Sequence, residues 1–134
     1  AANIVIVGSV GSYLGSSAGA AYITSKHAVV GLAKSLAWTY HWRNLRVNVV
    51  NPGAVSTSIL ENAMNRWPDR DIMDLEGNEL YNEKGSVALG VDAKGNNMLG
   101  EPEDIARAIL FCIDDENVFL NGAQITVDGG WTSF

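Results

Sequence analysis

The chain has 134 residues, of which 47% are hydrophobic, and its net charge is −6. This length fits one domain with a buried core. The negative charge argues against non-specific binding to nucleic acid, and no apolar run approaches the roughly 18 residues that a membrane-spanning helix needs. The one cysteine, Cys112, cannot form an internal disulfide. We therefore expect a cytoplasmic protein that binds neither nucleic acid nor membranes.

The first half of the chain predicts two strands on either side of a long helix. Residues 4–8 are β-branched and continuous, which is typical of a buried strand. A loop rich in glycine and serine over 8–20 leads into a helix over 21–42, whose apolar residues recur at helical spacing. This helix is rich in small residues, so a partner element could approach it closely. Residues 46–50 predict a second strand, which a Pro-Gly pair ends.

The second half is less regular. Residues 57 to about 66 predict a helix that Pro68 limits. The segment 69–100 is polar, contains glycines and carries mixed charge, so we expect a loop or a short helix there. A helix over 102–113 begins with proline in its first turn and acidic residues beside it, both of which favour a helix start. Residues 123–127 predict the last strand.

Strands that alternate with helices predict an α/β fold with parallel strands and right-handed crossovers. Three strands are few for such a sheet, and the first strand would expose an edge.

Two polar side chains stand four residues apart at the start of the long helix, Tyr22 and Lys26. Because positions i and i+4 share one helix face, the phenol and the ammonium point into the same space. An ammonium close to a phenol stabilises the phenolate, which suits the phenol to general acid/base catalysis. Ser9, thirteen residues before Tyr22 and at the end of a strand, is placed to hydrogen-bond a substrate oxygen on which charge develops. For the pair alone, the alternative is an ordinary helix start with a half-buried tyrosine and a solvated lysine.

The loop at residues 51–57 follows the second strand. One interpretation is a simple turn, because the Pro52-Gly53 pair makes turns well. The other is a binding loop, because glycine lets the backbone approach a flat ring and ligands bind at the carboxyl ends of parallel strands. The backbone of Val55 and the hydroxyl of Thr57 would then bond the ligand.

Together these motifs resemble the C-terminal half of a short-chain dehydrogenase/reductase. The Ser-Tyr-Lys set, the loop at 51–57, the helix start at 100–106 and the ending at 121–130 match that family in order. Only about residues 60–97 lack a family pattern. In the family, further strands and a glycine-rich dinucleotide fingerprint precede the serine-bearing strand. The resemblance thus implies that residues 1–134 are the C-terminal part of one Rossmann-like domain, with its N-terminal half supplied by another segment or chain.

The resemblance also implies a role for each site residue. Tyr22 would give or take the carbinol proton, Lys26 would bind the ribose hydroxyls of the nicotinamide, and Ser9 would hold the substrate oxygen. The reaction would interconvert a secondary alcohol and a ketone with NAD or NADP, in a homo-oligomer, under a substrate loop at about 58–100. Tyr22 is also an expected cofactor contact, together with Pro52, Gly53, Val55 and Thr57.

Two other functions stay open. The chain could be a non-catalytic half derived from this family, which acts only in assembly with a partner chain. It could also be an epimerase or dehydratase from the extended branch, which shares the Tyr-x-x-x-Lys pattern. The ending at 127–130 matches the short dehydrogenase branch better.

Several further patterns carry weaker signals. Residues 15–19 match G-x-S-x-G, but no strand precedes them, which excludes a hydrolase elbow. His27 and His41 have no cysteine or acidic partner at ligand spacing, so no metal site is expected. Trp38 and Trp42, also four residues apart, predict a packing stripe, and the resemblance implies that part of this stripe would be an interface between subunits.

Three polar features have mainly structural interpretations. Ser12 either lines the substrate pocket or makes a turn. Cys112 lies in a predicted apolar helix, which favours a buried, inert thiol. The acidic residues 114–116 predict a solvated helix end.

Overall fold

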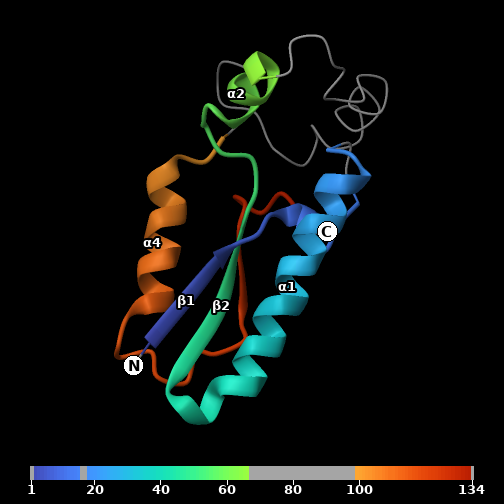
Figure 1. The fold of residues 1–134 in the computed structure, drawn as a ribbon. Helices are drawn as coiled ribbons and strands as arrows, with labels where there is room; N and C mark the ends of the chain where they lie inside the picture. The colour runs from blue at the N-terminus through green and yellow to red at the C-terminus, as the bar shows by residue number, and fades with distance from the viewer. Residues whose placement is uncertain (1, 16–17, 67–98, 134) are drawn as a thin grey trace.

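The structure, a computed structural model, describes residues 2–15, 18–66 and 99–133. Its three strands form one parallel sheet in the order β1-β2-β3, and helices α1 and α4 lie on opposite sides of it (Figure 1). The elements are β1 (Ala2–Val7), η1 (Val10–Ser12), α1 (Ala20–Tyr40), η2 (His41–Arg43), β2 (Leu45–Pro52), α2 (Ile59–Arg66), α4 (Pro102–Ile113) and β3 (Gln124–Val127). The predicted α/β class and the parallel sheet are confirmed.

The central strand β2 divides the core into two clusters. Side chains alternate across a strand, so Val47 and Val49 face α1, whereas Val50 faces α4. All three valines are at most 1% exposed. The α1 face of the strand is apolar from Leu45 to Val49, and on the other face Arg46 and Asn48 accompany Val50.

Helix α1 contacts β2 through small side chains. Val30, Ala33 and Ala37 recur at spacings of three and four and are buried. Ala33 and Ala37 carry only a methyl group each, which lets the helix lie close to the sheet, as the small residues predicted. The remaining small residues of the helix are exposed: Ala28, Gly31 and Ser35.

A buried arginine fastens the end of α4 to β2. Arg46 is 5% exposed, and its guanidinium donates to the carbonyl oxygens of Asn117 and Asp114 at 2.8 Å, Cys112 at 3.1 Å and Leu120 at 3.5 Å. These carbonyls follow or end the helix, where main-chain acceptors lack helical partners. One cation thus satisfies the turn between α4 and β3.

Arg46 also affects the thiol of Cys112, the one cysteine of the sequence. Cys112 is fully buried in the core cluster beneath α4. Burial raises the pKa of its thiol, although the positive charge of Arg46 acts in the opposite direction. This agrees with the predicted inert thiol, because the reactive thiolate is disfavoured.

The prediction of a buried first strand is wrong for the described residues, where its side chains are exposed or half-buried. Ile4 is 40% and Val7 is 47% exposed. The reason is that β1 is an edge strand in the described sheet, with β2 as its neighbour on one side. The predicted exposed edge is confirmed, and it explains the exposure.

The prediction that Trp38 and Trp42 form a packing stripe is wrong within this chain, and the expected contact with another subunit stays a prediction. Trp38 is 80% and Trp42 is 67% exposed. Helix α1 ends at Tyr40, two residues earlier than predicted, and Trp42 belongs to the short helix η2. Trp38 lies within α1 but off the face that Val30, Ala33 and Ala37 bury, so neither tryptophan packs on the sheet.

The late helix begins and ends where the sequence predicts, and the helix predicted from residue 57 begins two residues later, at α2. Most of the predicted loop over 69–100, and of the substrate loop, lies outside the described residues. None of the helices that the structure describes is long and apolar enough to cross a membrane.

Candidate functional site

One cavity of about 500 Å³ opens at the carboxyl ends of β1 and β2. Ligands bind at this edge in open α/β sheets because the connecting loops diverge there. Every residue predicted for the site lines this cavity: Ser9, Tyr22, Lys26, Pro52, Gly53, Val55 and Thr57. The structure thus brings together residues up to 48 positions apart in the sequence. Their roles stay predictions.

Lys26 lies beside Tyr22 and is anchored to the first strand. Its Nζ donates a hydrogen bond of 3.1 Å to the carbonyl oxygen of Val7 and lies 5.6 Å from the centroid of the Tyr22 ring. An ammonium has three donors, so two remain for a ligand. The phenol hydroxyl of Tyr22 makes no hydrogen bond to any residue that the structure describes. Both groups line the cavity and therefore have hydrogen-bond donors or acceptors available for a ligand.

Ser9 is held by its own backbone at the start of η1. Its Oγ accepts the N–H of Gly11 at 3.1 Å, and its N–H donates to Ser12 Oγ at 3.0 Å. This reciprocal cap fixes the serine but leaves its hydroxyl proton for a substrate oxygen. Ser12 is 4% exposed and serves this turn, which is one of the two roles open from the sequence.

Asn51 is a functional neighbour that the sequence analysis missed. It is fully buried, its Oδ1 accepts the N–H of Ser9 at 3.3 Å, and its Nδ2 donates to Gln124 Oε1 at 3.4 Å. A side chain on Gly8 would collide with Asn51 Oδ1 and Ser12 Oγ, which explains why a glycine precedes the serine. The signal available in the sequence was a polar residue at the end of a strand, directly before the Pro52-Gly53 pair.

The close packing of the loop against the end of β3 requires a glycine at position 53, whether or not a ligand is bound. A Cβ at this position would lie 2.7 Å from Asp128 Cβ and 2.8 Å from Asp128 Cα, and the N–H of Gly53 donates to the carbonyl oxygen of Val127 at 2.9 Å. The loop that carries the predicted cofactor contacts therefore rests directly on the end of β3. The absence of a side chain at Gly53 allows this close contact with β3. It also leaves room for the flat ring of a ligand, as the sequence analysis expected.

Val55 presents free backbone groups. The N–H of Ser56 donates to Gly100 O at 2.9 Å and the N–H of Gly100 donates to Ala54 O at 3.0 Å. This parallel bridge uses the groups on either side of Val55 and leaves its own N–H and C=O without a partner among the described residues. The Thr57 hydroxyl is likewise available there. The loop thus combines a fixed backbone with unused donors and acceptors.

Asp128 holds the turn against which Gly53 packs. Its carboxylate accepts the Thr132 hydroxyl at 2.6 Å, the Thr132 N–H at 2.9 Å and the Gly130 N–H at 3.0 Å. Burial acts to raise the pKa of Asp128, but the hydrogen bonds from Thr132 and Gly130 together outweigh it and hold the pKa below its ordinary value. The charged carboxylate is therefore part of the scaffold of the site.

Each histidine makes a hydrogen bond to a backbone carbonyl of its own helical segment. His27 Nδ1 donates to Ile23 O at 2.9 Å, and His41 Nδ1 donates to Trp38 O at 2.7 Å. Within the part of the chain that the structure describes, no three histidine, cysteine or acidic side chains gather to hold a metal ion.

Comparison with known proteins identifies the family. A family model described as enoyl-(acyl carrier protein) reductase matches residues 1–132. The short-chain dehydrogenase/reductase olcF of Penicillium canescens is 34% identical over 131 residues, which make up 98% of this chain and 48% of that protein. The chain spans about half the length of the curated relatives it matches.

Solved structures share the fold. The structure of 4-hydroxyisoleucine dehydrogenase complexed with NADH is 29% identical with a TM-score of 0.69, over 98% of this chain and 47% of that one. The structure of ElxO with NADP bound is 26% identical with a TM-score of 0.71, again over 98% and 47%. The bound nucleotides agree with the predicted NAD or NADP. By sequence and by fold, the chain belongs to the family of that model and to the short-chain dehydrogenases/reductases.

Proposed function

We propose that the cavity holds the nicotinamide end of NAD or NADP beside a secondary alcohol or a ketone, with Tyr22 as general acid/base. One observation carries the proposal: Ser9, Tyr22 and Lys26 line a single cavity of about 500 Å³ at the ligand-binding edge of a parallel sheet. A phenol, an ammonium and a hydroxyl in one cavity supply a proton donor, a charge and a hydrogen bond for chemistry at a carbonyl carbon.

The residues of the loop after β2 fit a nicotinamide. Its carboxamide carries an acceptor and a donor, which complement the free N–H and C=O of Val55, and the Thr57 hydroxyl adds a further partner. The two unused donors of Lys26 suit ribose hydroxyls. When bound, the nicotinamide supplies the hydride donor or acceptor.

Each polar side chain has its own part in the oxidation of an alcohol. Tyr22 takes the hydroxyl proton of the substrate as the hydride leaves its carbon, so that one proton and one hydride depart and a ketone results. Ser9 donates a hydrogen bond to the substrate oxygen, which fixes its position. The ammonium of Lys26 stabilises the phenolate that accepts the proton. In the reduction, Tyr22 returns the proton to the same oxygen.

The chain covers only 48% of the length of its relative olcF. This favours a second candidate function, a non-catalytic half that acts only in assembly with a partner chain. The activity is accordingly proposed for the protein or assembly in which the other half of the fold is present. Retention of the complete Ser-Tyr-Lys set supports the catalytic candidate.

The substitution Tyr22→Phe separates the two candidates. Oxidation or reduction of nicotinamide is followed with a panel of secondary alcohols and ketones and, given the description of the family model, an enoyl thioester. We expect turnover to fall by roughly 10²–10⁴-fold while cofactor binding persists, because only the proton-transfer group is lost. Tyr40→Phe, at the far end of α1, is the matched control and should leave turnover unchanged. Equal turnover in the Tyr22→Phe variant would refute the catalytic role.

A further inference from the structure

Tyr13 ends the short helix η1, which Ser9 caps at its start. The Tyr13 side chain is 40% exposed, and its hydroxyl lies 2.8 Å from Thr132 Oγ1 and 3.3 Å from Thr126 Oγ1. Thr126 belongs to β3, and Thr132 belongs to the turn that follows it. Because β2 lies between β1 and β3 in the sheet, this side chain bridges the end of the central strand and joins the Ser9 turn to β3.

The hydrogen bonds of this hydroxyl have a definite direction. The Thr132 hydroxyl has one proton, which it donates to the carboxylate of Asp128 at 2.6 Å, because a carboxylate only accepts. Tyr13 therefore donates its own proton to Thr132, and its oxygen accepts the proton of Thr126. Each bond polarises the next, and the last one ends on a charge, which strengthens the series. We name this series, from Tyr13 through Thr132 to Asp128, the Tyr13 network.

The Tyr13 network ends where the predicted cofactor loop rests. A Cβ on Gly53 would lie 2.7 Å from Asp128 Cβ. The residue at the end of the network thus packs against the loop at 51–57. Ser9 and this loop line the same cavity, so the network connects two of its walls.

The turn between Ser9 and Tyr13 also lies against the proposed general acid/base. Backbone hydrogen bonds within residues 9–14 close the turn, which makes it a single unit. A Cβ built at Gly11 would lie 3.4 Å from Tyr22 Cε1 and 3.5 Å from Ser9 Oγ. The turn therefore sets the spacing between the serine hydroxyl and the Tyr22 ring, and a contact that holds the turn also holds that spacing.

We propose that Tyr13 is a positioning residue for the proposed reaction. Its hydroxyl, through the Tyr13 network, holds the far end of the turn. Asn51 holds the near end, since it accepts the Ser9 N–H at 3.3 Å. Held at both ends, the turn keeps the serine hydroxyl at a fixed distance from the phenol and from the cofactor loop. A displacement of about 1 Å in such a set lowers a rate by up to about 100-fold. The inference rests on the proposed function, because it concerns the same cavity.

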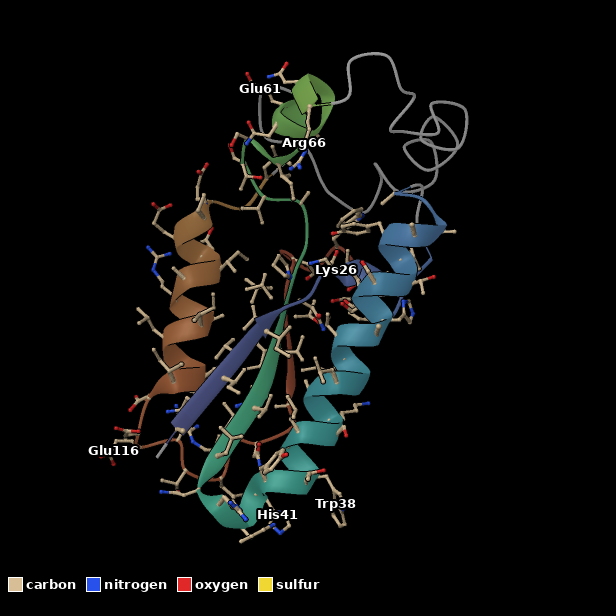
Figure 2. All side chains as sticks on the ribbon, in the orientation of Figure 1. Lys26, Trp38, His41, Glu61, Arg66 and Glu116 are labelled. Carbon is tan, nitrogen blue, oxygen red and sulfur yellow. The ribbon has the colours of Figure 1, made fainter. Side chains whose placement is uncertain are left out.

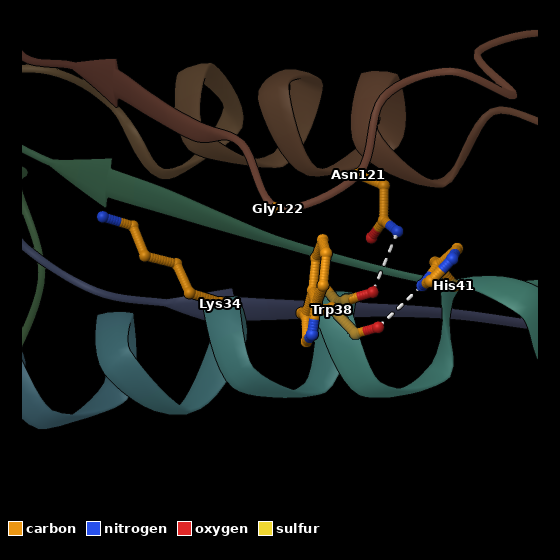
Figure 3. Close-up of a pocket in the computed structure, with 6 residues that line it drawn as sticks. Lys34, Trp38, His41, Asn121 and Gly122 are labelled. Atoms are coloured by element: carbon orange, nitrogen blue, oxygen red, sulfur yellow. Dashed lines mark hydrogen bonds between the residues drawn. The ribbon is translucent and has the colours of Figure 1, made fainter.

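Tyr40 offers a matched control. It is also 40% exposed, and its hydroxyl makes no hydrogen bond to any residue that the structure describes. In Figure 2, Lys26 lies near one end of α1, and Trp38 and His41 lie near the other. Figure 3 shows the hydrogen bond of 2.7 Å from His41 to the Trp38 carbonyl at that far end. Tyr40 lies between these two residues in the sequence, so Tyr40→Phe removes the same hydroxyl far from the cavity.

Hydrogen–deuterium exchange of the amides in residues 9–14 tests the network without any ligand. In Tyr13→Phe and in Thr132→Val, we expect these amides to exchange roughly fivefold faster, because the turn has lost one of its two anchors. Thr132→Ser keeps the hydroxyl and Tyr40→Phe leaves the network intact, so both should exchange like the unchanged protein. Exchange in β2 should stay the same in all four variants, which separates loss of the anchor from general loss of folding.

Steady-state kinetics with the best alcohol of the panel test the consequence for the reaction. We expect kcat of Tyr13→Phe to fall roughly tenfold with KM for NAD or NADP nearly unchanged, because the serine is displaced while the cofactor loop still packs on Asp128. Thr132→Val should reproduce this fall, whereas Thr132→Ser should keep its turnover. Tyr13→Phe combined with Thr132→Val should be no slower than either alone, because both break the same series of bonds.

Equal exchange at residues 9–14 in Tyr13→Phe and Tyr40→Phe would overturn the proposal. So would a lower kcat without faster exchange, because Tyr13 would then act on the substrate directly, and so would faster exchange with an unchanged kcat. Losses that multiply in the double variant would show that Tyr13 does not act through Thr132. An absence of turnover in the unchanged protein would instead refute the proposed function, and exchange would still decide whether the network holds the turn.

Discussion

The two ends of the parallel sheet use their polar groups in opposite ways. At the carboxyl end, hydrogen bonds fix the backbone around Ser9 and Val55 yet leave the serine hydroxyl proton and the valine N–H and C=O unused. At the other end, Arg46 directs its guanidinium at four main-chain carbonyls. One end is therefore organised to offer donors and acceptors to a ligand, and the other to satisfy its own chain.

The difference teaches how stability and binding are separated in this fold. Substitutions at the Arg46 end should cause the largest loss in the free energy of unfolding. Those near the cavity should alter ligand binding at a smaller cost in stability, because the free groups there contribute little to the fold.

Arg46→Met should give the largest loss of stability. The variant removes four hydrogen bonds from a charged donor and leaves the buried Cys112 carbonyl without its arginine donor, whereas the other three carbonyls each keep a second donor, so we expect a loss of about 3–5 kcal/mol in the free energy of unfolding. Urea unfolding followed by circular dichroism measures it. Arg43→Met is the control at an exposed position and should cost less than about 0.5 kcal/mol. Equal effects of the two substitutions would contradict the special position of Arg46.

Gly53→Ala should have the next largest effect, at the other end of the sheet. Its Cβ would lie 2.7 Å from Asp128 Cβ and 2.8 Å from Asp128 Cα, so the loop must shift, at a cost of about 1–3 kcal/mol. Cofactor affinity should fall with stability, because the same loop carries Val55 and Thr57. Both quantities are measurable by thermal unfolding with and without NADH and NADPH.

Gly31→Ala is a matched control for that substitution. No atom lies within 4 Å of a Cβ built at Gly31, which sits inside α1. The methyl group should therefore raise the free energy of unfolding by about 0.5–1 kcal/mol through helix propensity. If Gly53→Ala were equally harmless, the close approach of the loop to β3 would be refuted.

Asn51→Ala should have a moderate effect on stability and a small one on the position of Ser9. The variant removes one of the two acceptors of the Ser9 N–H, and we expect it to cost about 1–2 kcal/mol in unfolding free energy. Because Ser12 still accepts that N–H, the serine should keep its place. Ser12→Ala combined with Asn51→Ala should cost more than the sum of the two, which a double-mutant cycle measures. Strict additivity would show that the two acceptors act independently.

The sequence predicted the carboxyl end of the sheet better than the opposite end. Tyr22 and Lys26 share a face because helical geometry is local, and Ser9 and the loop at 51–57 follow strands whose carboxyl ends meet. Such placements need only the order of the elements. The predicted site residues accordingly line one cavity.

Contacts between distant residues had no comparable local signal. Arg46 meets carbonyls more than 65 positions away, and a charged residue at a strand position usually faces solvent. The position of Trp42 depended on where α1 ends, and helix ends are the least certain part of a periodic pattern. The Pro52-Gly53 pair indicated a turn or a binding loop, but the contact of Gly53 with Asp128 could be predicted only with knowledge of where β3 lies.

The smallest expected effect concerns acid stability at the end of β3. Hydrogen bonds hold the pKa of Asp128 below its ordinary value of 3.8, so the unfolded chain binds this proton more readily than the folded one. Stability from this group is therefore fully present above the unfolded pKa and is lost as the pH falls through the folded pKa. Asp128→Asn should remove that part of the acid dependence, since the amide does not titrate.

Urea unfolding at a series of pH values from about 2 to about 6 measures this slope. Glu103→Gln, which removes an exposed carboxylate on the first turn of α4, should leave the slope nearly unchanged. An identical slope in the Asp128→Asn variant would mean that the hydrogen bonds from Thr132 and Gly130 do not favour the charged form of the carboxylate. The loop that carries Val55 would then rest on β3 through close packing at Gly53 and its backbone hydrogen bond to Val127, without help from the charge of Asp128.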